Sequence, residues 1–172
     1  MWENTGRSRP KFARVPGDGQ ESVWDYPRPP RLAPDRRRIV VRAGGVIVVD
    51  TRGAIRVLET ASPPTIYLPP TDVDLGLLVA APGSSMCEWK GRAVYWSVRL
   101  ADGREYPQVG WSYPQPTVAF AAIAGWLSFY PGRVECEIDG ERVRPQPGSF
   151  YGGWVTNEIV GPFKGEPGTG HW

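Results

Sequence analysis

Short runs of β-branched residues, each followed by a turn rich in glycine or proline, recur along this chain. The stretch RIVVRAGGVIVVD contains two such runs joined at Gly44-Gly45, which is typical of a β-hairpin. Arg52-Gly53 turns the chain into a third strand, and VECEIDGERVR predicts another hairpin on Asp139-Gly140. This pattern favours a sheet of short, mostly antiparallel strands.

The middle of the chain predicts three more strands. TIYL is a short apolar run that ends at a pair of prolines. RAVYWSVRL predicts a longer strand, which turns at Asp102-Gly103. EYPQVGWSY predicts the returning strand, interrupted by Pro107 because proline cannot donate to a sheet.

Two segments predict helices. In PPTDVDLGLLV, Thr71 can cap a helix and Asp74 lies three residues later, as in a capping box. Ala80-Ala81-Pro82-Gly83 would end this helix. TVAFAAIAGWLSFY is the strongest helical pattern, because five of its residues recur on one helical face. These five are Ala119, Ile123, Trp126, Leu127 and Tyr130.

These elements predict a mainly β or α+β fold, with about eight short strands in a twisted sheet or sandwich and two helices. We expect three parts along the chain. Residues 1–21 form a flexible basic arm, and residues 22–38 form a Pro/Arg-rich segment packed on the body. Residues 39–172 form a single β-rich domain that includes an irregular C-terminal tail. The first 38 residues carry nine Arg and Lys against five Asp and Glu.

Composition limits the function classes. The 19 prolines and 21 glycines occur with eight Trp, seven Tyr and five Phe, and this aromatic content favours a folded domain over a disordered chain. The formal charge of +2 is too small to indicate binding of nucleic acid. No secretory signal and no membrane-length apolar run is present, and two cysteines fit a reducing compartment. We therefore expect a cytoplasmic protein that has no membrane partner. The sequence leaves open whether it forms a homodimer.

Three linked motifs carry a resemblance to a known family. They are CEWKG with the strand RAVYW directly after it, then WSYPQP, then AIAGWLSFYPGRVE. Together they resemble the bacterial, actinobacterial and fungal family catalogued as domain of unknown function 427, also labelled nucleotidyltransferase-like, in its longer form with both flanks. The matching positions are Cys87, Trp89, Lys90, Gly91, Ala93, Tyr95, Trp111, Tyr113, Pro114, Pro116, Tyr130 and Gly132. At the level of fold, the resemblance implies a β-tent-like arrangement.

The sequence predicts no cofactor and no metal. It has no GxxxxGK[ST] loop and no GxGxxG that opens a helix after a strand, so the transferase label has no phosphate-binding motif to support it. The β-tent proteins hold zinc with four cysteines, and two cysteines with one histidine cannot reproduce that site.

Residues 85–96, which begin SMCEWKG, concentrate the reactive side chains. Lys90 lies between an aromatic residue and a glycine, where a bulge at Gly91 could turn its ammonium into a pocket. There it would recognise an anion or a carbonyl, or form a Schiff base, whereas at an ordinary strand end its stem would only cover apolar surface. Cys87 is a candidate nucleophile beside Lys90, but the only histidine is His171, near the end of the chain.

Several aromatic residues and one acid complete the candidate site. Rings give a pocket its contact area, and indole and phenol groups give it orientation. The expected ligand-binding residues are Lys90, Trp89, Tyr95, Trp111, Tyr113 and Tyr67. Glu59 ends a strand nearby and could form a charge pair or an acid–base pair with Lys90. Each ring could equally belong to an ordinary core, and Glu59 could be a surface carboxylate beside a turn.

The function predicted on these grounds is the binding of a small molecule of unknown identity in an aromatic pocket around Lys90. The first alternative is an enzyme that performs group transfer or lysine- or cysteine-based chemistry in the same pocket, with Lys90, Cys87 and Glu59 as catalytic candidates. The second alternative is an interaction module that docks a partner through its proline-rich arm.

Overall fold

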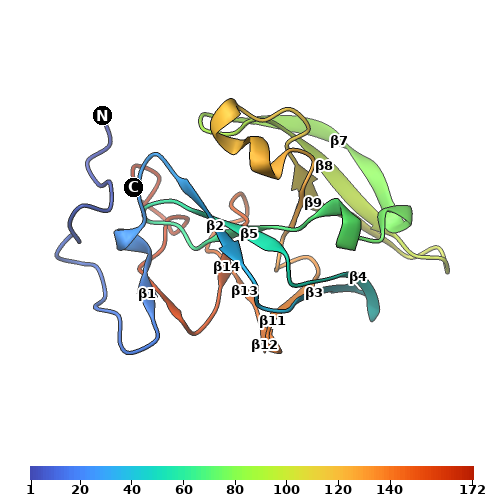
Figure 1. Cartoon of the computed structure of the whole chain (residues 1–172), viewed down its shortest axis with the longest axis horizontal. Coiled ribbons are helices and arrows are strands. Elements are labelled where there is room, and N and C mark those ends of the chain that lie inside the picture. The colour runs from blue at the N-terminus through green and yellow to red at the C-terminus, as the bar shows by residue number, and fades with distance from the viewer.

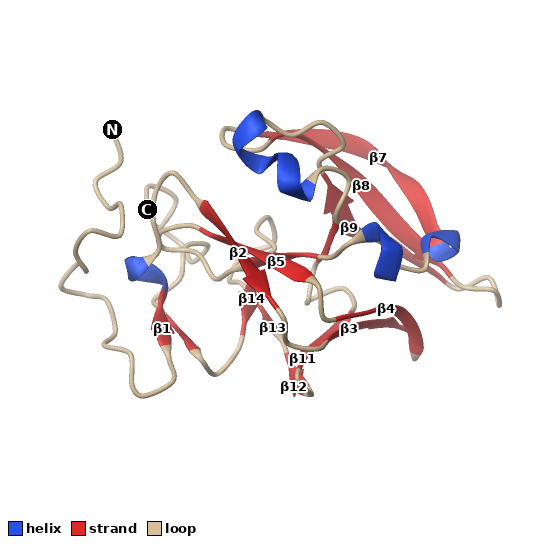
Figure 2. Cartoon of the chain, viewed as in Figure 1, coloured by secondary structure: helices blue, strands red, loops and turns tan.

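The computed structural model describes residues 1–172 as a β-rich molecule of fifteen short strands in five sheets, with four 3-10 helices and no α-helix (Figures 1 and 2). All paired strands except β1 and β15 are antiparallel. The mainly β class predicted from the sequence is confirmed. The predicted counts of eight strands and two helices are wrong, because many strands have only two or three residues.

Two sheets join to form the surface that carries the site. One has the order β10-β9-β8-β7 and the other β2-β5-β6. Their strands are β7 (Leu78–Cys87), β8 (Gly91–Arg99), β9 (Glu105–Ser112), β10 (Leu127–Phe129), β2 (Arg31–Asp35), β5 (Ala54–Leu58) and β6 (Thr65–Tyr67). Leu68 and Leu127 link them, because each donates its backbone N–H to the other's carbonyl at 2.8 and 3.0 Å. This single bridge joins the edges of the two sheets.

A second four-stranded sheet has the order β12-β11-β3-β4 and lies below the first in Figure 1. It consists of β3 (Ile39–Ala43), β4 (Val46–Thr51), β11 (Glu135–Ile138) and β12 (Glu141–Arg142). Both predicted hairpins are present in it. At the β11–β12 turn, Asp139 has φ +47° and Gly140 has φ +82°, the left-handed conformations that a type I′ turn requires.

Two small ladders pair segments near the ends of the chain with one another. The parallel pair is β1 (Glu21–Ser22) with β15 (Ile159–Val160), and the antiparallel pair is β13 (Arg144–Pro145) with β14 (Trp154–Val155). The two termini therefore lie on the same side of the molecule, away from β7–β9 (Figure 1). None of the four helices is long or apolar enough to cross a membrane.

The helix predicted over residues 117–130 is wrong. The chain forms a six-residue 3-10 helix, η4 (Val118–Ile123), and then turns at Gly125, whose φ is +73°. Leu127 begins strand β10, which pairs with β9 and with Leu68. Backbone pairing with two neighbouring strands replaces the helical hydrogen bonds that the apolar spacing predicted.

The helix predicted from Thr71 is also wrong. Two single-turn 3-10 helices, η2 (Pro70–Asp72) and η3 (Leu75–Leu77), occupy this segment. Between them the backbone N–H of Asp74 donates to Val48 O at 2.8 Å, which holds the segment against β4. Residues 80–83, expected to end a helix, lie within β7, where the register with β8 shifts between Ala81 and Ser84.

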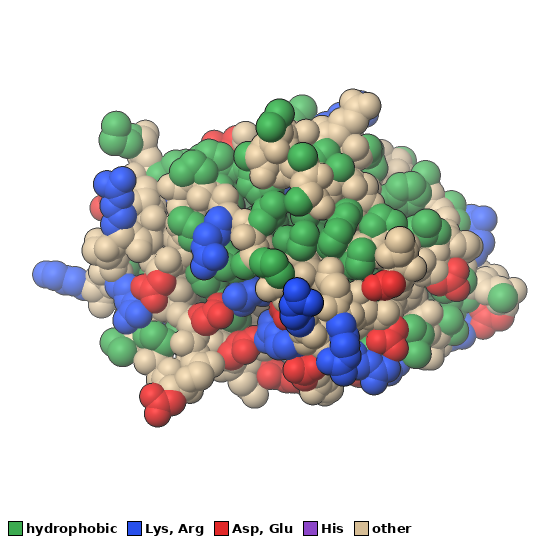
Figure 3. Space-filling model, in the orientation of Figure 1, with side chains coloured by type: hydrophobic (Ala, Val, Ile, Leu, Met, Phe, Trp, Pro, Cys, Tyr) green, Lys and Arg blue, Asp and Glu red, His purple; other side chains and the backbone are tan.

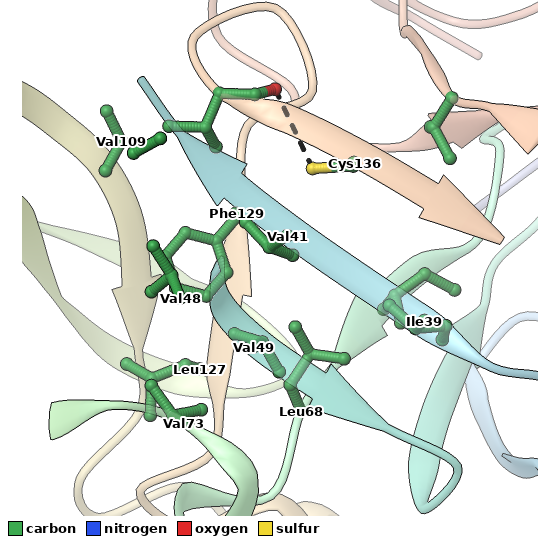
Figure 4. Packing of buried hydrophobic residues seen from close by; sticks show 14 of the residues in the cluster. Ile39, Val41, Val48, Val49, Leu68, Val73, Val109, Leu127, Phe129 and Cys136 are labelled. Atoms are coloured by element: carbon green, nitrogen blue, oxygen red, sulfur yellow. Dashed lines mark hydrogen bonds between the residues drawn. The ribbon is translucent and has the colours of Figure 1, made fainter. Parts of the chain in front are cut away.

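The largest core lies between the two main sheets and contains nineteen buried residues (Figure 4). Ile39, Val41, Leu68 and Phe129 are fully enclosed in it. Cys136 also belongs to this core, and burial raises the pKa of its thiol, so it serves as a small apolar side chain. A second, aromatic core of seven buried residues lies around Tyr67, Trp111 and Ile123.

The N-terminal segment contacts a third core, formed around Trp24 and Tyr26. Residues 1–20 contain no helix or strand, yet Trp2 lies 4.0 Å from the Arg28 guanidinium and Phe12 lies 5.0 Å from Trp24. Trp24 is completely buried. The mobility of residues 1–21 stays a prediction.

Candidate functional site

A cavity of about 200 Å³ opens over the aromatic side of these two joined sheets. Its floor comes from β5, β6, β8 and β9, and its walls come from the β7–β8 hairpin and residues 146–152. Seven of the eight candidate site residues line it: Glu59, Tyr67, Cys87, Lys90, Tyr95, Trp111 and Tyr113. Figure 3 shows hydrophobic side chains gathered in the middle of one face of the molecule, with charged side chains mostly along its lower edge.

The hairpin between β7 and β8 places Lys90 in this cavity. Cys87 pairs with Gly91, so Glu88, Trp89 and Lys90 form the loop. The bulge predicted at Gly91 is absent; instead Gly91 has φ +98° and returns the chain into β8 in regular register. Thr117, which precedes η4, fixes the loop from outside. Its Oγ1 donates to Trp89 O at 2.6 Å and its N–H donates to Lys90 O at 3.1 Å.

Lys90 is a buried cation without an ion pair. The residue is only 8% exposed, and its Nζ lies 5.6 Å from the Tyr113 ring centroid and 5.9 Å from that of Phe120. Burial opposes the charge, but Tyr67, Cys87 and Glu59 outweigh it and raise the pKa of Lys90 above its ordinary value. At neutral pH this side chain is therefore an ammonium that faces aromatic rings.

Two buried phenols accompany this ammonium. Tyr67 is fully enclosed, and its hydroxyl accepts a hydrogen bond from Trp111 Nε1 at 3.2 Å. Its own proton is thus left to donate. Burial raises the pKa of Tyr67 and Tyr113, so both keep their protons at neutral pH. Tyr95 Oη donates to Ser85 Oγ at 2.7 Å, which holds the Tyr95 ring across β7 and β8.

Glu59 lines the cavity but pairs with Arg28 rather than with Lys90. Arg28 Nε donates to Glu59 Oε1 at 3.2 Å, and the Arg28 side chain is 1% exposed. Trp89 Nε1 donates to the same oxygen at 3.2 Å. Trp89, which the sequence placed among the ligand-binding residues, thus does not line the cavity; it ties the hairpin loop to the end of β5. The charge pair predicted between Glu59 and Lys90 is not formed.

One wall of the cavity was not predicted. Residues 146–152 contribute Gln146, Phe150, Tyr151 and Gly152, and Tyr130 completes the aromatic lining. Gly152 lies directly on Trp111, since a Cβ added there would be 2.2 Å from the indole ring. The cluster of aromatic residues and glycines in SFYGGW was the available signal, but nothing in that stretch indicates which surface it covers.

The site offers few routes to covalent chemistry. Cys87 is half-buried in the lining, but His171 packs on Trp172 and lies outside the cavity. No group of three or more His, Cys, Asp or Glu side chains is placed to hold a metal ion. The chemistry that the arrangement offers most directly is one ammonium and two phenol donors among aromatic walls.

Comparison with known proteins gives one finding. A family model described as domain of unknown function (DUF427) matches residues 31–140, which include the β7–β8 hairpin and all the strands that line the cavity. A search of curated proteins found no match.

Proposed function

The chain belongs to the family of the domain of unknown function DUF427, and from this premise we propose that it binds a small organic molecule in the cavity around Lys90. The observation that carries the proposal is the buried, unpaired ammonium of Lys90 among aromatic rings. An isolated buried charge lowers stability unless a partner compensates it. A polar group of a bound molecule would be that partner, and the rings would supply contact area.

The test is a thermal-shift screen of small metabolites on the wild-type protein and on Lys90→Met. A ligand that uses Lys90 should raise the Tm of the wild type and leave that of Lys90→Met unchanged. Lys11→Met is the matched control, because Lys11 is exposed on the N-terminal segment. Equal stabilisation of wild type, Lys90→Met and Lys11→Met would place the ligand away from Lys90 and refute the proposal.

An enzymatic use of the same cavity is the second candidate. It is favoured by one observation, the presence of the Cys87 thiol in the lining beside Lys90. If Cys87 is a nucleophile, Cys87→Ser should abolish turnover of a ligand found in the screen and leave its binding intact. The docking of a partner through the proline-rich arm has less support, because Val23, Trp24 and Tyr26 are buried in the protein's own core.

A further inference from the structure

We propose that the ligand of this cavity is a planar molecule with a single carboxylate, of about the size of a substituted benzoate. The carboxylate would lie at Lys90, Tyr67 and Tyr113, with the ring against Trp111. This inference rests on the proposed function and specifies which molecules the cavity accepts.

The charge of the site selects a monoanion. Lys90 is the only cation in the lining, and Glu59 is its only carboxylate. The charge of Glu59 is compensated by Arg28 behind the wall. One positive charge is left over, so one negative charge on the ligand neutralises the cavity. A phosphate dianion or a nucleoside triphosphate would bring more negative charge than Lys90, the one cation of the lining, compensates.

The hydrogen-bond donors select an oxygen acid. Lys90 has no ion-pair partner and faces the rings of Tyr113 and Phe120, so its ammonium is available to donate to a ligand oxygen. The phenols of Tyr67 and Tyr113 line the same cavity and keep their protons. A carboxylate can accept from all three groups, and hydrogen bonds to a charged acceptor are about twice as strong as neutral ones.

The walls select a flat ligand. Trp111 is packed edge-on against Tyr67, with centroids 6.4 Å apart and an interplanar angle of 90°, and lies 4.6 Å from Tyr130. Tyr95 lies directly opposite Trp111 in the β8–β9 ladder. The cavity of about 200 Å³ is smaller than the roughly 300–1,000 Å³ of pockets for drug-sized ligands. A small aromatic acid matches this space better than a drug-sized ligand does.

The mouth of the cavity adds a preference for apolar substituents. Met86 and Phe150 belong to the lining, yet they are 74% and 69% exposed. Exposed apolar side chains at a pocket mouth are compensated when a ligand covers them. A substituent on the ring, pointing away from the carboxylate, would contact these two side chains as it leaves the cavity.

Calorimetry on the full chain tests this inference with four probes: benzoate, 4-butylbenzoate, benzamide and inorganic phosphate. We expect both benzoates to bind one per chain with a Kd at or below about 1 mM, the butyl compound more tightly. Benzamide, which keeps the ring but lacks the charge, should bind at least about tenfold more weakly, and phosphate should not bind.

Two variants and one control locate the carboxylate. Lys90→Met should weaken benzoate binding at least about tenfold and keep the fold, since it removes a buried charge. Tyr113→Phe keeps the packing and loses one donor, so it should weaken binding severalfold. Lys11→Met should bind as the wild type does.

The outcomes separate this inference from the proposed function. The inference that the ligand is a carboxylate is refuted if benzamide binds as tightly as benzoate. It is also refuted if phosphate binds more tightly than benzoate. In both cases the proposal of a Lys90-dependent pocket is unaffected. The same holds if no benzoate binds while another metabolite stabilises the wild type but not Lys90→Met. If no probe and no metabolite distinguishes wild type from Lys90→Met, both proposals fail.

Discussion

Substitution of Gly152 by alanine tests whether residues 146–152 are fitted onto the Trp111 indole. The added Cβ would lie 2.2 Å from Cη2 and 2.6 Å from Cζ3 of Trp111, whereas protein Cβ contacts essentially never fall below 3.0 Å. The ring or the segment must therefore move by about 0.8 Å. Trp111 has little room for this shift, because its Nε1 donates to Tyr67 and its ring packs on Tyr130.

The expected cost follows from this clash. Adding a methyl group to a well-packed interior typically destabilises a protein by about 1–3 kcal/mol. For a chain of this size that corresponds to a loss of about 2–12 °C in Tm, measured by calorimetry. Gly132→Ala is the matched control, because its Cβ would lie 3.5 Å from Pro145, an ordinary contact. The control should stay within about 0.5 kcal/mol of the wild type or become slightly more stable.

A double-mutant cycle identifies the clashing partner. Trp111→Phe removes the outer indole ring that meets the new Cβ, so Gly152→Ala should cost less in that background than in the wild type. The reasoning is refuted if Gly152→Ala melts no lower than Gly132→Ala. It is also refuted if the cost of Gly152→Ala is unchanged by Trp111→Phe, since the strain would then lie elsewhere.

Two further predictions concern the N-terminal segment and pH. Removing residues 1–20 should lower the Tm less than removing residues 1–34, because the longer deletion also takes Trp24, Tyr26 and most of strand β2; equal Tm values would contradict a docked segment. Burial opposes the charges of Glu21 and Asp35, but hydrogen bonds from Arg56 and Arg37 outweigh it and lower both pKa values. Since a lowered pKa means that the folded state binds the proton less tightly, both carboxylates stabilise the fold at neutral pH. That contribution should disappear as the pH falls below their ordinary values of 4.5 and 3.8. Urea unfolding from about pH 7 to pH 3 measures this, and Glu21→Gln should reduce the acid loss; an unchanged profile would exclude Glu21 as a cause.

The hairpins could be predicted from the sequence because their determinants are local. Gly44 and Gly45 have φ values of +55° and +82°, and Asp139-Gly140 has the same left-handed pair. Glycine and aspartate at such positions indicate the turn type from only two residues. The strands on either side then follow from β-branched runs, as in β3 and β4.

The sequence contains no local signal against a helix over residues 117–130. Its apolar residues do recur at helical spacing, but they belong to two different cores. Ile123 packs with Tyr67 and Trp111 in the aromatic core, whereas Leu127 packs between the two main sheets. A periodic pattern shows that residues are buried, and it does not show that they share one face. The decisive contact, between Leu68 and Leu127, joins residues far apart in sequence.

The candidate site likewise has a part that local sequence predicts and a part that depends on tertiary packing. The cation and most of its rings could be predicted, because they occupy one hairpin loop and the paired strands that follow it, whereas Tyr67 comes from β6 in the neighbouring sheet. The closing wall and the partner of Glu59 could not, since Gly152 and Arg28 reach the site only through tertiary packing. Both residues also lie outside the region 31–140 that the family model matches. Lys90 itself is enclosed by Tyr113 and Phe120, which lie within that region. The flanking segments of this chain therefore supply one wall of the cavity and the partner of Glu59, whereas the burial of the ammonium comes from the matched region.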